Sequence, residues 1–178
     1  MLGPIPIRVE PVETLIHADR GLAFQVATAF GASSGSDAPS TRVLKDEGGR
    51  LLVEFLTETK QLFGRRKVYR TVEWVTKHEP DRIDFEGVEG PLAMLRDRFT
   101  FLPDGGCAVL RYESEFAVRW WVLGWIVGIA YVRPMLRRFM VDHVKELKET
   151  IEARARRSKV YPQVPCSRPE EHVMEEAA

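Results

Sequence analysis

Few residues of this 178-residue chain have the type and spacing that catalysis requires. None of the four histidines stands at a metal-ligand spacing from another histidine or a cysteine. The sequence also contains no G-x-S-x-G turn, no phosphate-binding loop and no dinucleotide fingerprint. We therefore predict neither a metal site nor a bound cofactor. The histidines are His17, His78, His143 and His172.

The two cysteines are predicted to be free thiols. Cys107 lies in an alternating apolar segment, and Cys166 lies in a proline-rich polar stretch near the C-terminus. A disulfide scaffold usually needs more cysteines than two. The first ten residues, MLGPIPIRVE, have neither a basic leader nor an apolar run of signal-peptide length. A reducing, cytoplasmic location is therefore the expectation.

The composition indicates a globular domain without an overall charge. Apolar residues make up 44% of the chain, which is enough for a substantial core. Twenty-six basic residues balance 26 acidic ones, so the chain lacks the positive field that favours nucleic acid. The basic stretch RARRSK is interpreted as a solvated helix end. No nucleic-acid partner is predicted.

The segment from Thr41 to Val118 has the pattern of consecutive antiparallel strands. Its apolar stretches are separated by DEGG, FGRR, HEPD, VEGP and PDGG, which are typical turn sequences. A first strand within 5–16 and a helix capped by Asp19 precede it, followed by the loop sequence GASSGSDAPS. The predicted strands of the meander are 41–46, 50–58, 66–78, 82–88, 92–102 and 107–118.

The last hairpin predicts one charged face and one apolar face. Closing it across PDGG pairs Leu102 with Cys107 and places Asp97 opposite Tyr112 on the apolar face. A buried acid needs a hydrogen-bond partner, which Tyr112 or Ser114 could supply. Asp97 is thus a weak catalytic candidate or a polar ligand contact, unless it lies at a solvated end of the sheet.

A long amphipathic helix is predicted after Pro134. Apolar residues recur there at three- and four-residue steps, with charged residues between them. This apolar stripe can cover the apolar face of the hairpin. The stretch after Lys159 is rich in proline and acidic at its end, which predicts a disordered tail. We therefore expect one domain, 1–159, and a tail, 160–178.

The run VRWWVLGWIVGIAYVRPMLRR leaves three interpretations open. Its 13 uncharged residues between Arg119 and Arg133 span about 20 Å as a helix, too short for a bilayer core of about 30 Å. The run could be core, in which Trp121, Trp125 and Ile129 are buried. It could close one end of a cavity. It could also contact a membrane peripherally. The residues expected at such a membrane contact are Trp120, Trp121, Trp125 and Arg133.

The order of these elements resembles the helix-grip fold of the START/Bet v1-like superfamily, also called SRPBCC. That superfamily includes polyketide cyclase/dehydrase and coenzyme Q-binding relatives. The matching stretches are VETLIHADRGLAFQVA, HEPDRIDFEG, FTFLPDGGCAVLRYE and VRPMLRRFMVDHVKELKETIE. The resemblance runs from about Val9 to Ala155. It implies an α+β domain in which a curved antiparallel sheet of about seven strands wraps around the C-terminal helix.

The resemblance also implies a hydrophobic cavity between sheet and helix. We therefore expect the protein to bind or carry an apolar small molecule such as a lipid, a quinone or a polyketide-like ring system. A cyclase, aromatase or dehydratase using the same cavity is the alternative, and a peripheral membrane or protein-partner module is a further one. The residues expected to line the cavity are Asp97, Phe99, Phe101, Leu110, Tyr112, Phe116, Trp125, Ile129, Met140 and Val144.

Overall fold

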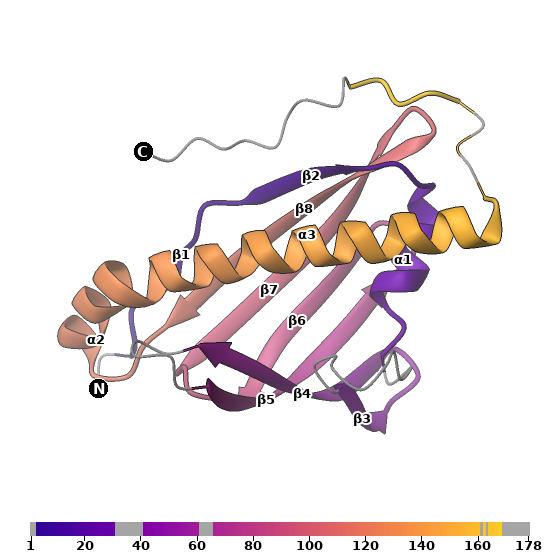
Figure 1. Ribbon diagram of the computed structural model, residues 1–178. Coiled ribbons are helices and arrows are strands. Elements are labelled where there is room, and N and C mark those ends of the chain that lie inside the picture. The colour runs from indigo at the N-terminus through magenta and orange to yellow at the C-terminus, as the bar shows by residue number, and fades with distance from the viewer. Residues whose placement is uncertain (1–2, 31–40, 61–65, 161, 163, 169–178) are drawn as a thin grey trace.

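A curved antiparallel sheet holds one long helix across its concave face (Figure 1). The computed structural model describes residues 3–30, 41–60, 66–160, 162 and 164–168. The predicted loop GASSGSDAPS lies outside the described residues. In chain order the elements are β1 (Ile7–Arg8), β2 (Val12–Ile16), α1 (Arg20–Ala27), β3 (Thr41–Asp46), β4 (Arg50–Lys60), β5 (Arg66–His78), β6 (Arg82–Glu89), β7 (Met94–Asp104), β8 (Cys107–Ala117), α2 (Trp121–Val127), the π-helical segment η1 (Gly128–Val132) and α3 (Arg133–Ser158).

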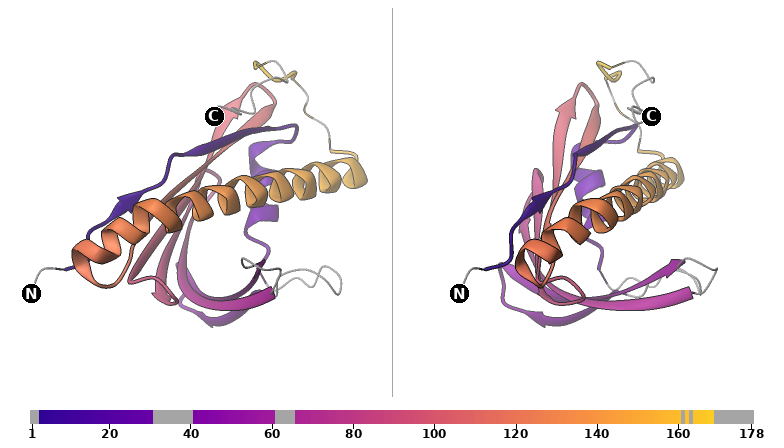
Figure 2. Two further views of the ribbon diagram at one scale, coloured as in Figure 1. Left: turned by 60° about the vertical axis from the view of Figure 1, so that its left-hand side comes forward. Right: turned by 90° about the vertical axis from the view of Figure 1, so that its left-hand side faces the viewer.

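The sheet confirms the predicted α+β helix-grip architecture. Its eight strands are arranged in the order β1-β8-β7-β6-β5-β4-β3, and β2 also pairs with β8. The single strand predicted within 5–16 is divided into β1 and β2. Between the pairs Arg8–Glu115 and Val12–Tyr112, the N-terminal chain has three residues, 9–11, whereas β8 has only two, 113–114. The pairing is therefore interrupted there, and Pro11 has no N–H to donate to the ladder. Figure 2 shows the curvature of the whole sheet, in which β3 to β5 turn beneath the helix.

The register of the β7–β8 hairpin differs from the prediction. The turn is the two-residue Gly105–Gly106, where Gly105 has φ +63°, instead of the four-residue PDGG loop. Asp97 therefore lies opposite Ser114 and not opposite Tyr112. The shift is two residues on the β8 side. Because side chains alternate with a period of two, each residue keeps its predicted face.

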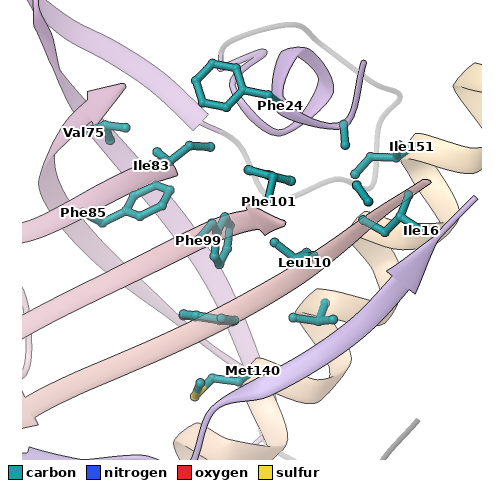
Figure 3. Packing of buried hydrophobic residues seen from close by; sticks show 14 of the residues in the cluster. Ile16, Phe24, Val75, Ile83, Phe85, Phe99, Phe101, Leu110, Met140 and Ile151 are labelled. Atoms are coloured by element: carbon teal, nitrogen blue, oxygen red, sulfur yellow. The ribbon is translucent and has the colours of Figure 1, made fainter. Parts of the chain in front are cut away.

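The core lies between the concave face and α3. The α3 side chains Met140, Val144 and Ile151 are at most 2% exposed and pack with residues of β2, β8 and α1. Figure 3 shows Met140 and Ile151 beside the inward-facing side chains of the sheet. The predicted cap of α1 is confirmed, since Asp19 Oδ1 accepts hydrogen bonds from the N–H groups of Gly21 and Leu22.

The amphipathic helix predicted after Pro134 is the later part of a longer helix, which begins at Trp121 and continues through α2 and η1 into α3. The buried residues of α2 and η1 are Gly124, which faces the link between β8 and α2, and Gly128, which faces Ile7 and Phe116 of the sheet, so the large side chains point outward. The interpretation of Trp121, Trp125 and Ile129 as core is therefore wrong: they are 47%, 39% and 36% exposed. No helix in the described part of the chain has the length and apolar character needed to cross a membrane.

The free-thiol prediction is also wrong, because Cys107 and Cys166 form a disulfide. The backbone N–H groups of Ser167 and Arg168 both donate to Asp104 Oδ2 at 3.0 Å. Residues 164–168 are thereby held against the β7–β8 turn. The two cysteines are 59 residues apart, and nothing in their local sequences indicates that the chain returns to this turn. The division of the chain at 159 stays a prediction.

Replacing Cys166 by serine should destabilise the oxidised protein. The disulfide closes a long loop and so restricts the unfolded chain, which predicts a loss of about 2–4 kcal/mol in the free energy of unfolding. Urea denaturation of both proteins, with and without reductant, measures this loss. Reductant should lower the stability of the wild type alone. Equal stability of the two oxidised proteins would show that the bond contributes nothing.

Candidate functional site

Two carboxyl groups lie on the concave face of the sheet. Glu73 of β5 is 8% exposed and lies between Val53 of β4 and Gly87 of β6. Asp97 of β7 lies between Phe85 of β6 and Ser114 of β8. The described residues form no salt bridge to either carboxyl group. The two acids therefore face an apolar interior without a compensating cation.

Asp97 has one satisfied oxygen and one that lacks a partner. The Tyr112 hydroxyl donates to Asp97 Oδ2 at 3.0 Å. Asp97 Oδ1 and the Ser114 hydroxyl oxygen are buried, and neither makes a hydrogen bond of good geometry within the described part of the chain, although the Ser114 hydroxyl lies close enough to stabilise the charge of Asp97. The predicted partnership of Asp97 with Tyr112 is confirmed as a diagonal contact. The carboxyl group retains an acceptor that a ligand could use.

Burial makes both acids weak. It raises the pKa of Asp97 to about 6, although Ser114 and Tyr112 stabilise the charged form in part. The pKa of Glu73 rises to about 7, because burial and the repulsion of Asp97 together outweigh the Thr71 hydroxyl. Burial and the neighbouring Asp97 raise the pKa of Tyr112 as well. At neutral pH the two acids together carry less than two full charges.

An aromatic row adjoins the carboxyl pair. The His143 ring of α3 stacks between Phe139 and Phe99, with centroid separations of 5.7 and 5.8 Å. Burial lowers the pKa of His143, so its ring is neutral at pH 7. Edge-to-face contacts then link the remaining rings of the row. The members of the row are Phe30, Phe55, Phe85, Phe99, Tyr112, Phe139 and His143.

Eight of the ten predicted lining residues gather around this interior. Seven of them are at most 5% exposed and belong to one packed cluster. Asp97 is half-buried as a whole residue, and its Oδ1 atom is buried. Figure 3 shows four of these residues with labels. They are Asp97, Phe99, Phe101, Leu110, Tyr112, Phe116, Met140 and Val144. Trp125 and Ile129 lie apart from them, exposed on α2 and η1.

The space next to β7 and β8 is occupied by these side chains. A molecule that reaches the carboxyl pair must therefore displace rings of the aromatic row. A hollow of about 270 Å³ lies elsewhere, on the surface between the β1–β2 link and the helix. It is lined by Glu10, Ile129, Arg133, Pro134 and Arg137.

Sequence reasoning missed Glu73 and gave no role to His143. The strand around Glu73 has apolar residues on both faces, since Val72 and Trp74 alternate with Glu73 and Val75. The missing signal was the pairing with β4, whose inward residues Val53 and Leu51 lie opposite Glu73 and Val75. Within the described residues, no group of three or more His, Cys, Asp or Glu side chains could hold a metal ion.

Replacing Glu73 by glutamine should stabilise the protein in a pH-dependent way. The pKa of Glu73 is about 7 in the folded protein and near 4.5 in the unfolded chain, so ionisation of Glu73 lowers the free energy of unfolding. This loss of stability is absent below pH 4.5 and complete above about pH 7. Glu73→Gln should gain up to about 3 kcal/mol over the wild type at pH 8. Urea denaturation across this pH range measures the gain. Glu86→Gln, at an exposed position, is the control, and a gain that does not grow with pH would contradict the assignment.

Comparison with known proteins supports the fold. No family model matches the sequence, and no curated protein matches it either. Among solved structures, the Zhui aromatase/cyclase from Streptomyces sp. R1128 is 14% identical with a TM-score of 0.64, covering 87% of this chain and 96% of its own. A protein from Thermus thermophilus is 18% identical with a TM-score of 0.59, covering 85% of this chain and 99% of its own.

A START superfamily protein from Mycobacterium smegmatis is 16% identical with a TM-score of 0.52, covering 86% of this chain and 98% of its own. These identities are low, but the alignments extend over nearly the whole of each protein. This chain therefore has the helix-grip fold of the START/Bet v1-like, or SRPBCC, superfamily.

Proposed function

We propose that the protein binds an apolar small molecule between the concave face of the sheet and α3, and that Glu73 and Asp97 hold a polar group of that molecule. The observation that carries the proposal is the buried carboxyl pair, in which Asp97 Oδ1 has no hydrogen-bond partner among the described residues. The resemblance to an aromatase/cyclase and a START protein supports an apolar ligand.

The two carboxyl groups on the concave face reduce the stability of the folded protein unless a ligand pairs with them. An unpartnered carboxyl group in an apolar interior costs free energy, and a well-packed apolar residue at either position would avoid that cost. A bound hydroxyl or amine group could donate to Asp97 Oδ1 and recover it. The site therefore fits a ligand that combines an apolar body with a hydrogen-bond donor. Lipids, reduced quinones and phenolic ring systems have this combination.

Most of the affinity would come from the apolar body of the ligand. Burial of about 300 Å² of ligand surface would contribute about 7 kcal/mol before the cost of association. The aromatic row offers flat rings for this contact. Its outermost ring, Phe139, is 37% exposed, and it contacts His143, which in turn contacts Tyr112.

Native mass spectrometry of the purified protein tests the binding proposal. We expect a non-covalent adduct of an apolar compound that disappears under denaturing conditions. Asp97→Leu removes the polar contact but preserves the approximate size of the side chain. It should weaken binding of that compound about tenfold or more. The exposed Asp46→Leu, on β3, is the control. Absence of an adduct, together with unchanged melting after addition of apolar extracts, would contradict the proposal.

A cyclase, aromatase or dehydratase activity is the second candidate. The observation that favours it is the pair of pKa values, about 6 for Asp97 and about 7 for Glu73, because proton transfer is efficient when the pKa of the group lies near the working pH. Tyr112 would orient Asp97 through its hydrogen bond. The aromatic row would hold the substrate rings against the acids.

Asp97→Asn separates the two candidates, because it keeps the shape of the side chain and removes its titratable proton. An enzyme should retain binding of the compound identified by mass spectrometry and lose its conversion by about 100-fold or more. Conversion can be followed by liquid chromatography, with Asp46→Asn as the control. Conversion at the wild-type rate by Asp97→Asn would exclude Asp97 as the acid or base.

A further inference from the structure

The α2–η1 surface concentrates large apolar side chains in water. Trp120 is 78% exposed, and Leu123 and Tyr131 are each 61% exposed. Figure 2 shows α2 at the end of the long helix, beyond the sheet. Single exposed apolar residues are common, but a continuous set of this kind marks an interaction site. The α2–η1 surface consists of Trp120, Trp121, Val122, Leu123, Trp125, Ile126, Val127, Ile129 and Tyr131, all of them exposed.

The packing of this segment explains why its large side chains point outward. Gly124 and Gly128 are one helical turn apart, and both are buried against the chain that leads out of β8. A Cβ atom at Gly124 would lie 2.0 Å from the Arg119 carbonyl oxygen, and one at Gly128 would lie 2.4 Å from Ile7 Cδ1. The segment therefore uses its two glycines for internal contact. A helical segment whose fully buried residues are two glycines, and whose large apolar side chains are mostly exposed, needs another partner.

The backbone before α2 is held in an unfavourable conformation. Trp120 and Trp121 have φ values of +76° and +40°, in the left-handed region that bulky residues rarely adopt. Such conformations cost about 1–3 kcal/mol each and cluster at functional positions. Here they turn the chain sharply from β8 into α2. This turn leaves the Trp120 ring in solvent at the tip of the molecule.

The charge around the surface distinguishes among partners. No acidic residue occurs between Glu115 and Asp142, whereas four arginines do. Arg133 pairs with Glu10, and Arg137 donates to the Glu10 carbonyl oxygen at 3.2 Å. Arg119 and Arg138 are exposed and form no ion pair within the described part of the chain. Glu10 is thus the carboxylate at this margin, and it is paired with Arg133. Tryptophans flanked by the unpaired Arg119 and Arg138 match the boundary of an anionic bilayer.

We propose that the α2–η1 surface docks onto anionic lipid membranes. The indole rings and Leu123 would enter the boundary between headgroups and acyl chains, while Arg119 and Arg138 contact lipid phosphates. The hollow beside Arg133 and Arg137 adjoins Ile129 of the same surface, and its lining also contains Glu10, which pairs with Arg133. This membrane contact needs no ligand on the concave face, so it is independent of the proposed binding function.

Co-sedimentation with vesicles tests the proposal. We expect the full chain to pellet with vesicles of phosphatidylcholine mixed with phosphatidylglycerol, and to pellet less with phosphatidylcholine alone. The double variant Leu123→Ser, Ile126→Ser should bind about tenfold or more weakly, because two apolar contacts are lost. Val68→Ser, Val88→Ser is the matched control, since both valines are exposed on the sheet. Arg119→Glu, Arg138→Glu should abolish the preference for anionic vesicles, and Arg157→Glu should preserve it.

Fluorescence gives an independent readout of the same contact. Three of the four tryptophans lie in the α2–η1 surface. The fourth, Trp74, is on β5, and the guanidinium group of Arg50 lies over its ring. In the Trp74→Phe variant, anionic vesicles should shift the emission to shorter wavelength, and brominated lipids should quench it. Equal pelleting of the wild type and the Leu123→Ser, Ile126→Ser variant would overturn the proposal. The proposal would also be overturned if the wild type does not bind vesicles but forms a dimer in sedimentation velocity that the Leu123→Ser, Ile126→Ser variant does not form.

Discussion

The packing of α3 across the concave face is the contact on which the rest of the structure depends. One helix covers the inward side chains of β7 and β8, and its residues Met140, Val144 and Ile151 are almost completely buried there. Without it, Phe99, Phe101 and the other inward residues would face water, at a cost of about 25 cal/mol per Å². The helix α1 adds to this cover through Phe24, which contacts Phe101 of β7. Because α3 carries His143 beside the aromatic row, its position also determines how much room a ligand has beside the carboxyl pair.

Alternation along the strands made most of this arrangement predictable. The predicted strands agree with β3 to β8 to within two residues, and the inward face of β7 and β8 was assigned correctly from a wrong register. An error of two residues preserves the face, whereas an error of one would have reversed it. The contact of Asp97 with Tyr112 survived for the same reason, as a diagonal neighbour on one face. A sheet therefore tolerates uncertainty in its turns better than uncertainty in its alternation.

The features that the sequence did not reveal depend on contacts between distant residues. The pairing of β4 with β5 places Glu73 on the concave face. The sequence does not show this face, because β5 has apolar residues on both of its sides. Cys166 meets Cys107 only because the chain returns to the β7–β8 turn after α3. The outward direction of the tryptophans is one of the three interpretations that the sequence leaves open, and it follows from the burial of Gly124 and Gly128 on the inner side of the helix.

The continuity of the helix links the two proposals. His143, which contacts the aromatic row, and the α2–η1 surface belong to one helix that runs from Trp121 to Ser158. The π-helical segment η1 interrupts its regular hydrogen bonding between them, and such segments are common at functional positions. If α2 enters a bilayer, this one helix also carries His143, which contacts the aromatic row beside Asp97. Membrane docking would then hold the proposed binding site close to the medium in which apolar ligands dissolve.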